Sequence, residues 1–146
     1  MESAILKMLE EFILELGSDF TFLARQKRIS VDWVDYYLDL LFYHRGMRRL
    51  VAIELKLGKF TAADKGQMEL YLRWLDKYER KKGEKMPLGL ILCAEKSGNH
   101  VELLQLEKSG IRVAQYLTDL PSKKLITQKL QEAVVLAKEQ THKNKN

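Results

Sequence analysis

The stretch that decides the fold spans residues 50–57 and reads LVAIELKL, an apolar run interrupted by Glu54 and Lys56. Its length and aliphatic content predict a buried β-strand. Side chains two apart in a strand point the same way, so Glu54 and Lys56 share one face. The other face is taken by Ile53, Leu55 and Leu57. Charged side chains are rarely buried without a partner, so we expect a compensating group nearby.

Two apolar segments precede this strand. Residues 20–24 (FTFLA) and 36–43 (YYLDLLFY) are predicted strands, and residues 45–47 (RGM) form a plausible turn. Because the connections are short, an antiparallel meander of the three strands is the simplest arrangement.

Helices and further strands complete the pattern. Helical spacing of apolar residues predicts a helix over 5–16, and a second over 61–78 opens with Thr61 and Asp64 placed as in a capping box. The remaining predicted elements are a strand at 88–94, a helix at 101–108, a strand at 111–116 and a helix at 125–138. The order α-β-β-β-α-β-α-β-α predicts an α/β fold.

Composition places the chain among single-domain globular proteins. It has 146 residues, of which 46% are hydrophobic, and we expect one domain over 1–140 with a disordered basic tail at 141–146. The net charge is +5, but six Lys and two Glu in 121–146 account for +4 of it, so charge is weak evidence for a nucleic-acid partner. The single cysteine, together with no apolar run long enough to span a membrane and no signal peptide, fits a cytoplasmic protein without a membrane partner.

Acidic residues in two neighbouring strands suggest a metal site. Asp39 is expected to face opposite to Leu38 and Leu40, and pairing of its strand with residues 50–57 would bring it near Glu54. Two carboxylates suit Mg²⁺, which keeps several waters and binds substrate phosphate. Lys56 beside such an ion could orient or help to deprotonate an attacking water, which predicts phosphodiester hydrolysis.

A plainer interpretation stays open for the same residues. Glu54 and Lys56 would then be an exposed polar pair on a half-buried sheet, and Asp39 an acid at its edge.

The helix over 61–78 and a basic segment add candidate contacts. Gln67 and Tyr71 are four apart and lie on one helical face. Gln67 can hydrogen-bond a phosphate oxygen or a metal-bound water, while Tyr71 can orient Gln67 or touch a nucleic acid. Arg25 and Lys27, with Arg28, could contact phosphates or form an exposed basic face.

The ordered set Asp39, Glu54-x-Lys56 and Gln67-x-x-x-Tyr71 resembles the PD-(D/E)XK nuclease superfamily. The segments FILELGSDFTFLARQK, YLDLLFYHR, LVAIELKLGKF, GLILCAEK and VAQYL are similar, in order, to the C-terminal nuclease domain of bacterial YhcG-type proteins. The similarity runs from about residue 10 to residue 120.

The resemblance implies a restriction-endonuclease-like core, a central mixed sheet flanked by helices, acting on DNA with Mg²⁺ or Mn²⁺. Asp39 and Glu54 would be metal ligands, Lys56 the catalytic lysine and Gln67 an accessory catalytic group. The superfamily often adds an acid from the first helix, here Glu11 or Glu15, with Glu15 favoured by its place near the start of the sheet.

This sequence departs from the family pattern in two ways. Leu38 stands where many members have proline before the metal-binding acid. YhcG-type proteins also carry an N-terminal helical domain that this chain lacks, so we expect either a fragment or a free-standing domain.

These observations leave three functional hypotheses. The first is a Mg²⁺-dependent endodeoxyribonuclease, with a homodimer among its expected states. The second is a nuclease-fold module that binds DNA or a protein without cutting, and the third is an interaction domain in which the charged residues form structural ion pairs. The presence of Asp39, Glu54, Lys56 and Gln67 together favours the first.

Overall fold

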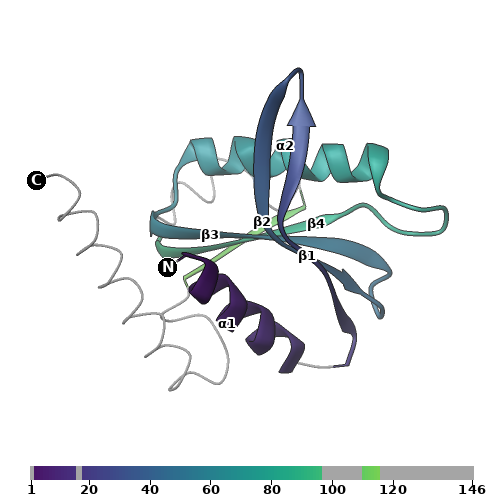
Figure 1. The fold of residues 1–146 in the computed structure, drawn as a ribbon, viewed down its shortest axis with the longest axis horizontal. Helices are drawn as coiled ribbons and strands as arrows, with labels where there is room; N and C mark the ends of the chain where they lie inside the picture. Colours follow the sequence, from purple (N-terminus) through teal and green to yellow (C-terminus); the bar gives the residue numbers. More distant parts are fainter. Residues whose placement is uncertain (1, 16–17, 97–109, 116–146) are drawn as a thin grey trace, which may run out of the picture.

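The computed structural model describes residues 2–15, 18–96 and 110–115. Within these ranges five strands form one sheet in the order β1-β2-β3-β4-β5. Helix α1 (Glu2–Glu15) lies against one face of the sheet and helix α2 (Ala62–Tyr78) against the other (Figure 1). The strands are β1 (Phe20–Val31), β2 (Val34–His44), β3 (Arg49–Lys59), β4 (Leu88–Glu95) and β5 (Ile111–Gln115).

The sheet is mixed. β1, β2 and β3 pair antiparallel, which confirms the predicted meander, whereas β3, β4 and β5 pair parallel. Parallel neighbours need a crossover, and α2 supplies it between β3 and β4. The predicted helices at 101–108 and 125–138 and the predicted tail at 141–146 lie outside the described residues.

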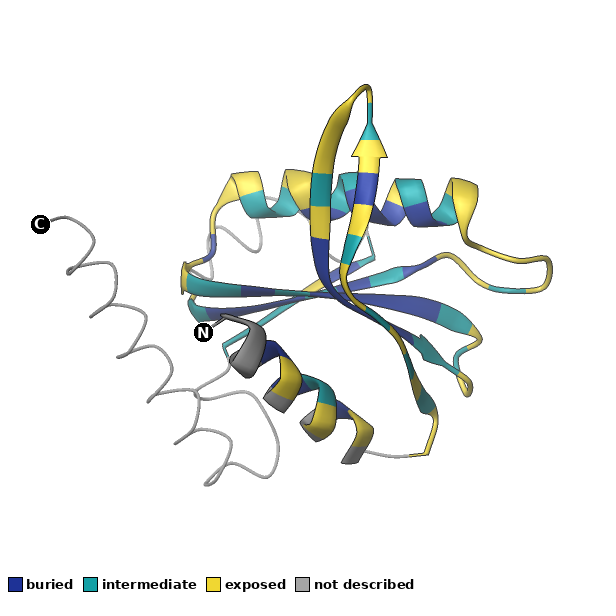
Figure 2. Ribbon diagram, in the orientation of Figure 1, coloured by how far each residue is buried: buried dark blue, intermediate teal, exposed yellow. Residues whose placement is uncertain are grey.

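Two apolar layers hold the helices on the sheet. On one side Leu6, Leu9 and Ile13 of α1 pack with Ile53 and Leu55 of β3. On the other side α2 packs against the sheet through Met68, Tyr71, Leu72 and Leu75. The centre of the sheet is therefore buried on both faces (Figure 2).

The alternation of β3 agrees with the prediction from residues 50–57. Ile53 and Leu55 belong to the α1 layer, and Ala52 belongs to the α2 layer. Since alternate residues share a face, Glu54 and Lys56 lie on the α2 side of β3.

The β1–β2 hairpin is longer than predicted. The strand expected over 20–24 continues to Val31, and a two-residue turn of Asp32 and Trp33, with φ of 48° and 68°, joins it to β2. The outer part of the hairpin extends past α2 (Figure 1), and much of it is exposed (Figure 2). Residues 26–28 and 30 are polar because this part of the hairpin has a solvent-facing side, so apolar periodicity did not mark it as strand.

The alternation within β2 is broken at Asp39. Leu38 packs in the α2 layer and Leu40 in the α1 layer, although residues two apart in a regular strand share a face. The expectation that Asp39 faces opposite to both leucines is therefore wrong. β1 changes sides at the same place: Arg25 contacts α1 and Lys27 contacts α2, with the left-handed residue Gln26 (φ 52°) between them.

The helices formed by the described residues are either too short or too polar to cross a lipid bilayer.

Candidate active site

Asp39 and Glu54 meet where β2 and β3 separate. The regular pairing of these strands ends at Leu40 and Ile53. At the next position the Asp39 N–H donates to Glu54 Oε1 at 2.9 Å, and the Leu55 N–H donates to Asp39 Oδ2 at 2.8 Å. At this point the two carboxylates take the place of the backbone carbonyl oxygens that accept hydrogen bonds in a regular sheet. Each carboxylate is held by a backbone N–H of the opposite strand.

Asp39 is strongly buried for an acid. Only 5% of its surface is exposed, and among the described residues it is the one charged residue that is buried. A third contact comes from β1, where Gln26 Nε2 donates to Asp39 Oδ1 at 3.0 Å. Both carboxylate oxygens therefore accept hydrogen bonds, which offsets part of the cost of burying the charge.

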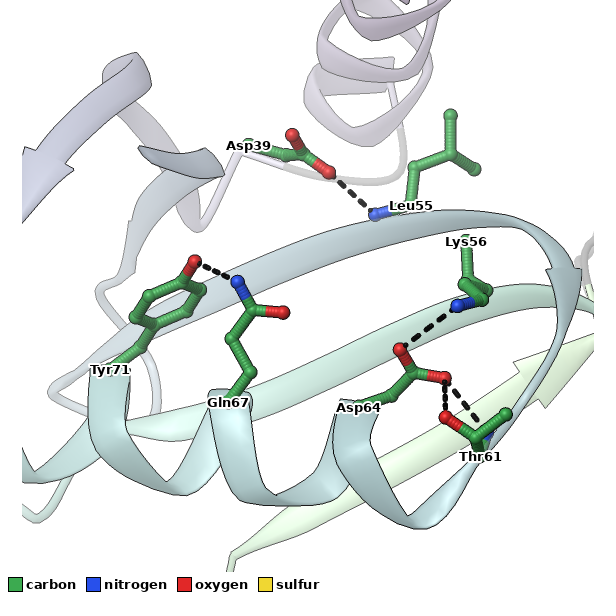
Figure 3. A network of polar contacts seen from close by, with 7 residues as sticks. All are labelled: Asp39, Leu55, Lys56, Thr61, Asp64, Gln67 and Tyr71. Atoms are coloured by element: carbon green, nitrogen blue, oxygen red, sulfur yellow. Dashed lines mark hydrogen bonds and ion pairs between the residues drawn. The ribbon is translucent and has the colours of Figure 1, made fainter. Parts of the chain in front are cut away.

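Lys56 reaches the start of α2. Its ammonium nitrogen lies 3.3 Å from Asp64 Oδ1 (Figure 3), and 40% of the lysine side chain is exposed. Asp64 Oδ2 accepts the Thr61 N–H at 2.8 Å and the Thr61 hydroxyl at 3.0 Å, and the predicted capping box is present. One carboxylate therefore both caps α2 and holds the lysine, a second role that the sequence pattern did not indicate.

Gln67 and Tyr71 form a hydrogen-bonded pair one helical turn apart. Gln67 Nε2 donates to the Tyr71 hydroxyl oxygen at 2.6 Å (Figure 3). Tyr71 is fully buried, whereas Gln67 is exposed. Burial raises the pKa of the Tyr71 hydroxyl well above its usual value, the charge of Glu54 raises it further, the bond from Gln67 lowers it, and Asp39 adds a smaller increase. The phenol therefore stays neutral and lies within electrostatic reach of both acids.

The burial of Tyr71 corrects one expectation. A side chain with no exposed surface cannot touch a nucleic acid, so direct contact through Tyr71 is excluded in this conformation. Its hydrogen bond fits the other expectation, that it orients Gln67.

Arg25 and Lys27 do not form a common patch. Arg25 lies 3.8 Å from Glu10 on α1, whereas Lys27 lies 3.1 Å from Glu79, just after α2, and over the ring of Trp74. The two cations therefore point to opposite sides of the hairpin, and acidic neighbours offset their charge.

The acid expected from the first helix is not assigned. Glu11 is exposed on α1, and the side chain of Glu15 lies outside the described part of the structure. Within the described ranges, no group of three or more His, Cys, Asp or Glu side chains is arranged to hold a metal ion. The described residues thus bring together two carboxylates, Asp39 and Glu54.

Gln26 and Asp64 were missed by sequence reasoning as parts of this site. Detecting Gln26 requires the register of β1 against β2, and the polar outer part of β1 has no apolar pattern that indicates this register. Asp64 had a signal, its capping-box position, but that signal predicts a structural role alone.

Comparison with known proteins identifies the family of this chain. The model of the YhcG PDDEXK nuclease domain family matches residues 1–134. The chain is 39% identical over 131 residues to the protein named "Putative nuclease YhcG" of Escherichia coli (strain K12), and the match covers 88% of this chain and 35% of that protein. The chain therefore spans about a third of the length of this relative.

Two solved structures share the fold. A repair endonuclease from Pyrococcus abyssi superimposes with a TM-score of 0.61 at 19% identity, covering 79% of this chain and 46% of that one. The EndoMS-dsDNA2 complex gives 0.52 at 21% identity, covering 73% and 43% of the respective chains. These likenesses confirm the restriction-endonuclease-like fold. With a family model that matches most of its length, the chain belongs to the YhcG PDDEXK nuclease domain family.

Proposed function

We propose that this domain is a divalent-metal-dependent nuclease that hydrolyses phosphodiester bonds in DNA. One observation carries the proposal: Asp39 and Glu54 are held together where β2 and β3 part, with the charge of Asp39 buried. A buried carboxylate beside a second acid is costly in a purely structural role, and such groups mark functional sites. The solved complex of EndoMS with dsDNA supports DNA as the substrate class.

The donor set of the site suits Mg²⁺ or Mn²⁺. Asp39 and Glu54 would hold the ion, because an ionised carboxylate has about four lone-pair sites and can bind a cation while it also accepts hydrogen bonds. Mg²⁺ is commonly bound by one or two carboxylates, with waters and substrate phosphate completing its shell. When bound, the ion would supply a Lewis acid that stabilises negative charge on the phosphodiester.

Lys56 is proposed as the catalytic lysine. It shares the α2 side of β3 with Glu54, and its exposed fraction of 40% leaves the ammonium accessible to a substrate. There it would orient the attacking water and stabilise charge on the phosphate oxygens. The ion pair with Asp64 restricts the long side chain and so reduces the entropy lost on binding.

Gln67 is proposed as an accessory contact. The hydrogen bond to buried Tyr71 uses one hydrogen of its amide and leaves the other hydrogen and the carbonyl oxygen for a phosphate or a water. Arg25 and Lys27 are proposed as secondary phosphate contacts, weakened by their acidic neighbours.

The test is a cleavage assay on labelled linear, nicked and branched DNA with Mg²⁺, Mn²⁺ or excess EDTA. We expect cleavage that depends on the metal and is abolished in Lys56→Ala. The matched control is Lys59→Ala, which changes an exposed lysine three residues further along β3 and is expected to keep cleavage. DNA binding without cleavage in any metal would instead favour the module that binds without cutting.

A further inference from the structure

Gln26 has a backbone conformation that is uncommon for a residue with a side chain. Its φ is 52°, in the left-handed region. In the described ranges, the other non-glycine residues with positive φ lie in the turns between strands: Asp32, Trp33 and Arg48. Gln26 lies inside β1, and strain at such a position persists only where the surrounding structure requires it.

The strained residue lies directly across from Asp39. Arg25 is paired with Leu40 and Lys27 with Leu38, which places Gln26 opposite Asp39. The Gln26 amide donates to Asp39 Oδ1 at 3.0 Å, and the Leu55 N–H donates to Oδ2 at 2.8 Å. The two oxygens of this carboxylate are thus held from the two strands on either side of it, β1 and β3.

The side chains of β1 change from one face of the sheet to the other at Gln26. Arg25 contacts Glu10 of α1, whereas Lys27 contacts Trp74 of α2, although regular alternation would place both cations on one face. The left-handed residue between them accounts for this change of side. It brings the amide of an exposed residue to a buried acid.

We propose that Gln26 is a positioning residue for the metal-binding carboxylate of Asp39. Its left-handed backbone directs a neutral donor to Oδ1, so that the plane of the carboxylate is fixed while its negative charge is kept for the cation. This inference rests on the proposed function, because it assigns Asp39 to a divalent metal site. Groups that orient a metal ligand in this way commonly change metal affinity 10–100-fold when they are removed, so a comparable effect of about tenfold is expected here.

Two variants separate the amide from the backbone strain. Gln26→Met keeps a linear side chain and the strain but removes the donor, whereas Gln26→Gly removes the donor and relieves the strain. Gln26 is exposed, so neither variant opens a cavity in the core. Arg48→Gly is the matched control, because it relieves a positive φ of 53° in the β2–β3 turn.

The measurement is Mn²⁺ binding by isothermal titration calorimetry, with melting temperature and cleavage followed in parallel. We expect both Gln26 variants to weaken Mn²⁺ binding about tenfold, with cleavage recovering at high Mn²⁺, although their melting temperatures change differently. Arg48→Gly is expected to bind Mn²⁺ as the unmodified domain does.

Unchanged Mn²⁺ affinity in both Gln26 variants, with a lower melting temperature in either, would overturn the positioning role and leave a structural one. Weakened binding in only one of the two variants would also overturn it, because both variants lack the amide. If the unmodified domain neither binds Mn²⁺ nor cleaves DNA, the proposed function itself fails, and this is visible before any variant is compared.

Discussion

The ammonium group of Lys56 lies 3.3 Å from a carboxylate oxygen of Asp64, and the other oxygen of that carboxylate caps helix α2. The position of the proposed catalytic lysine is therefore tied to the first turn of the helix that carries Gln67. A substitution at the cap is therefore expected to change the cleavage rate by altering the position of Lys56.

Replacing Asp64 by Asn tests this link. The amide keeps an acceptor for the Thr61 N–H but loses the ion pair and the favourable charge at the helix N-terminus. Because Lys56 is substantially exposed, solvent screens the pair, and we expect a loss of less than about 1 kcal/mol in the free energy of unfolding. Cleavage is expected to fall much further, about tenfold, as judged from single-turnover rates.

The control for this variant is Asp76→Asn, which removes the ion pair of Asp76 with Arg80 near the other end of α2. Equal losses of cleavage in the two variants would show that general helix stability, and not the lysine, is responsible.

A second prediction concerns Gln67. Gln67→Met removes the amide while keeping the length of the side chain, and it leaves the buried Tyr71 hydroxyl without its donor. We expect cleavage to fall at least tenfold and the free energy of unfolding to fall by about 1 kcal/mol. Arg73→Met, on an exposed side of the same helix, is the control and is expected to retain activity. Full activity of Gln67→Met would remove Gln67 from the site.

A third prediction follows from the raised pKa of Tyr71. The unfolded chain ionises Tyr71 near its ordinary pKa of 10.0, whereas the folded protein keeps the proton to higher pH. The contribution of Tyr71 to the free energy of unfolding is therefore fully present below pH 10. Above pH 10 this contribution falls by about 1.4 kcal/mol per pH unit, because the unfolded chain loses the proton first.

Urea unfolding at pH 9, 10 and 11 checks this prediction. Tyr71→Phe is expected to show a shallower loss of stability above pH 10 than the unmodified domain, whereas Tyr78→Phe, at a 61% exposed position, is expected to show the same loss. Identical pH dependence in all three proteins would contradict the burial of an un-ionised Tyr71.

The sequence was most informative where apolar periodicity is strong. Residues 50–57 predicted β3 and the shared face of Glu54 and Lys56, because a central strand is buried on both sides and its two charges stand out. The capping-box pattern of Thr61 and Asp64 located the start of α2 for a similar reason: the capping contacts are local.

The features missed by the sequence depend on contacts between distant residues. The outer half of β1 is polar, so its sequence did not indicate a strand. It is a strand because it pairs with β2 across the hairpin. The left-handed conformation of Gln26 and the broken alternation around Asp39 lie within this paired region and cannot be inferred from local propensity. The contact between Lys56 and Asp64 likewise requires the path of the chain from β3 into α2.

The most direct measurement is Mn²⁺ titration of the unmodified domain beside Asp39→Asn and Glu54→Gln, each checked for folding by circular dichroism. If the two carboxylates form the proposed metal site, the unmodified domain binds Mn²⁺ and both variants lose that binding together with cleavage. Equal Mn²⁺ binding in all three folded proteins would contradict the proposal that Asp39 and Glu54 hold the metal ion.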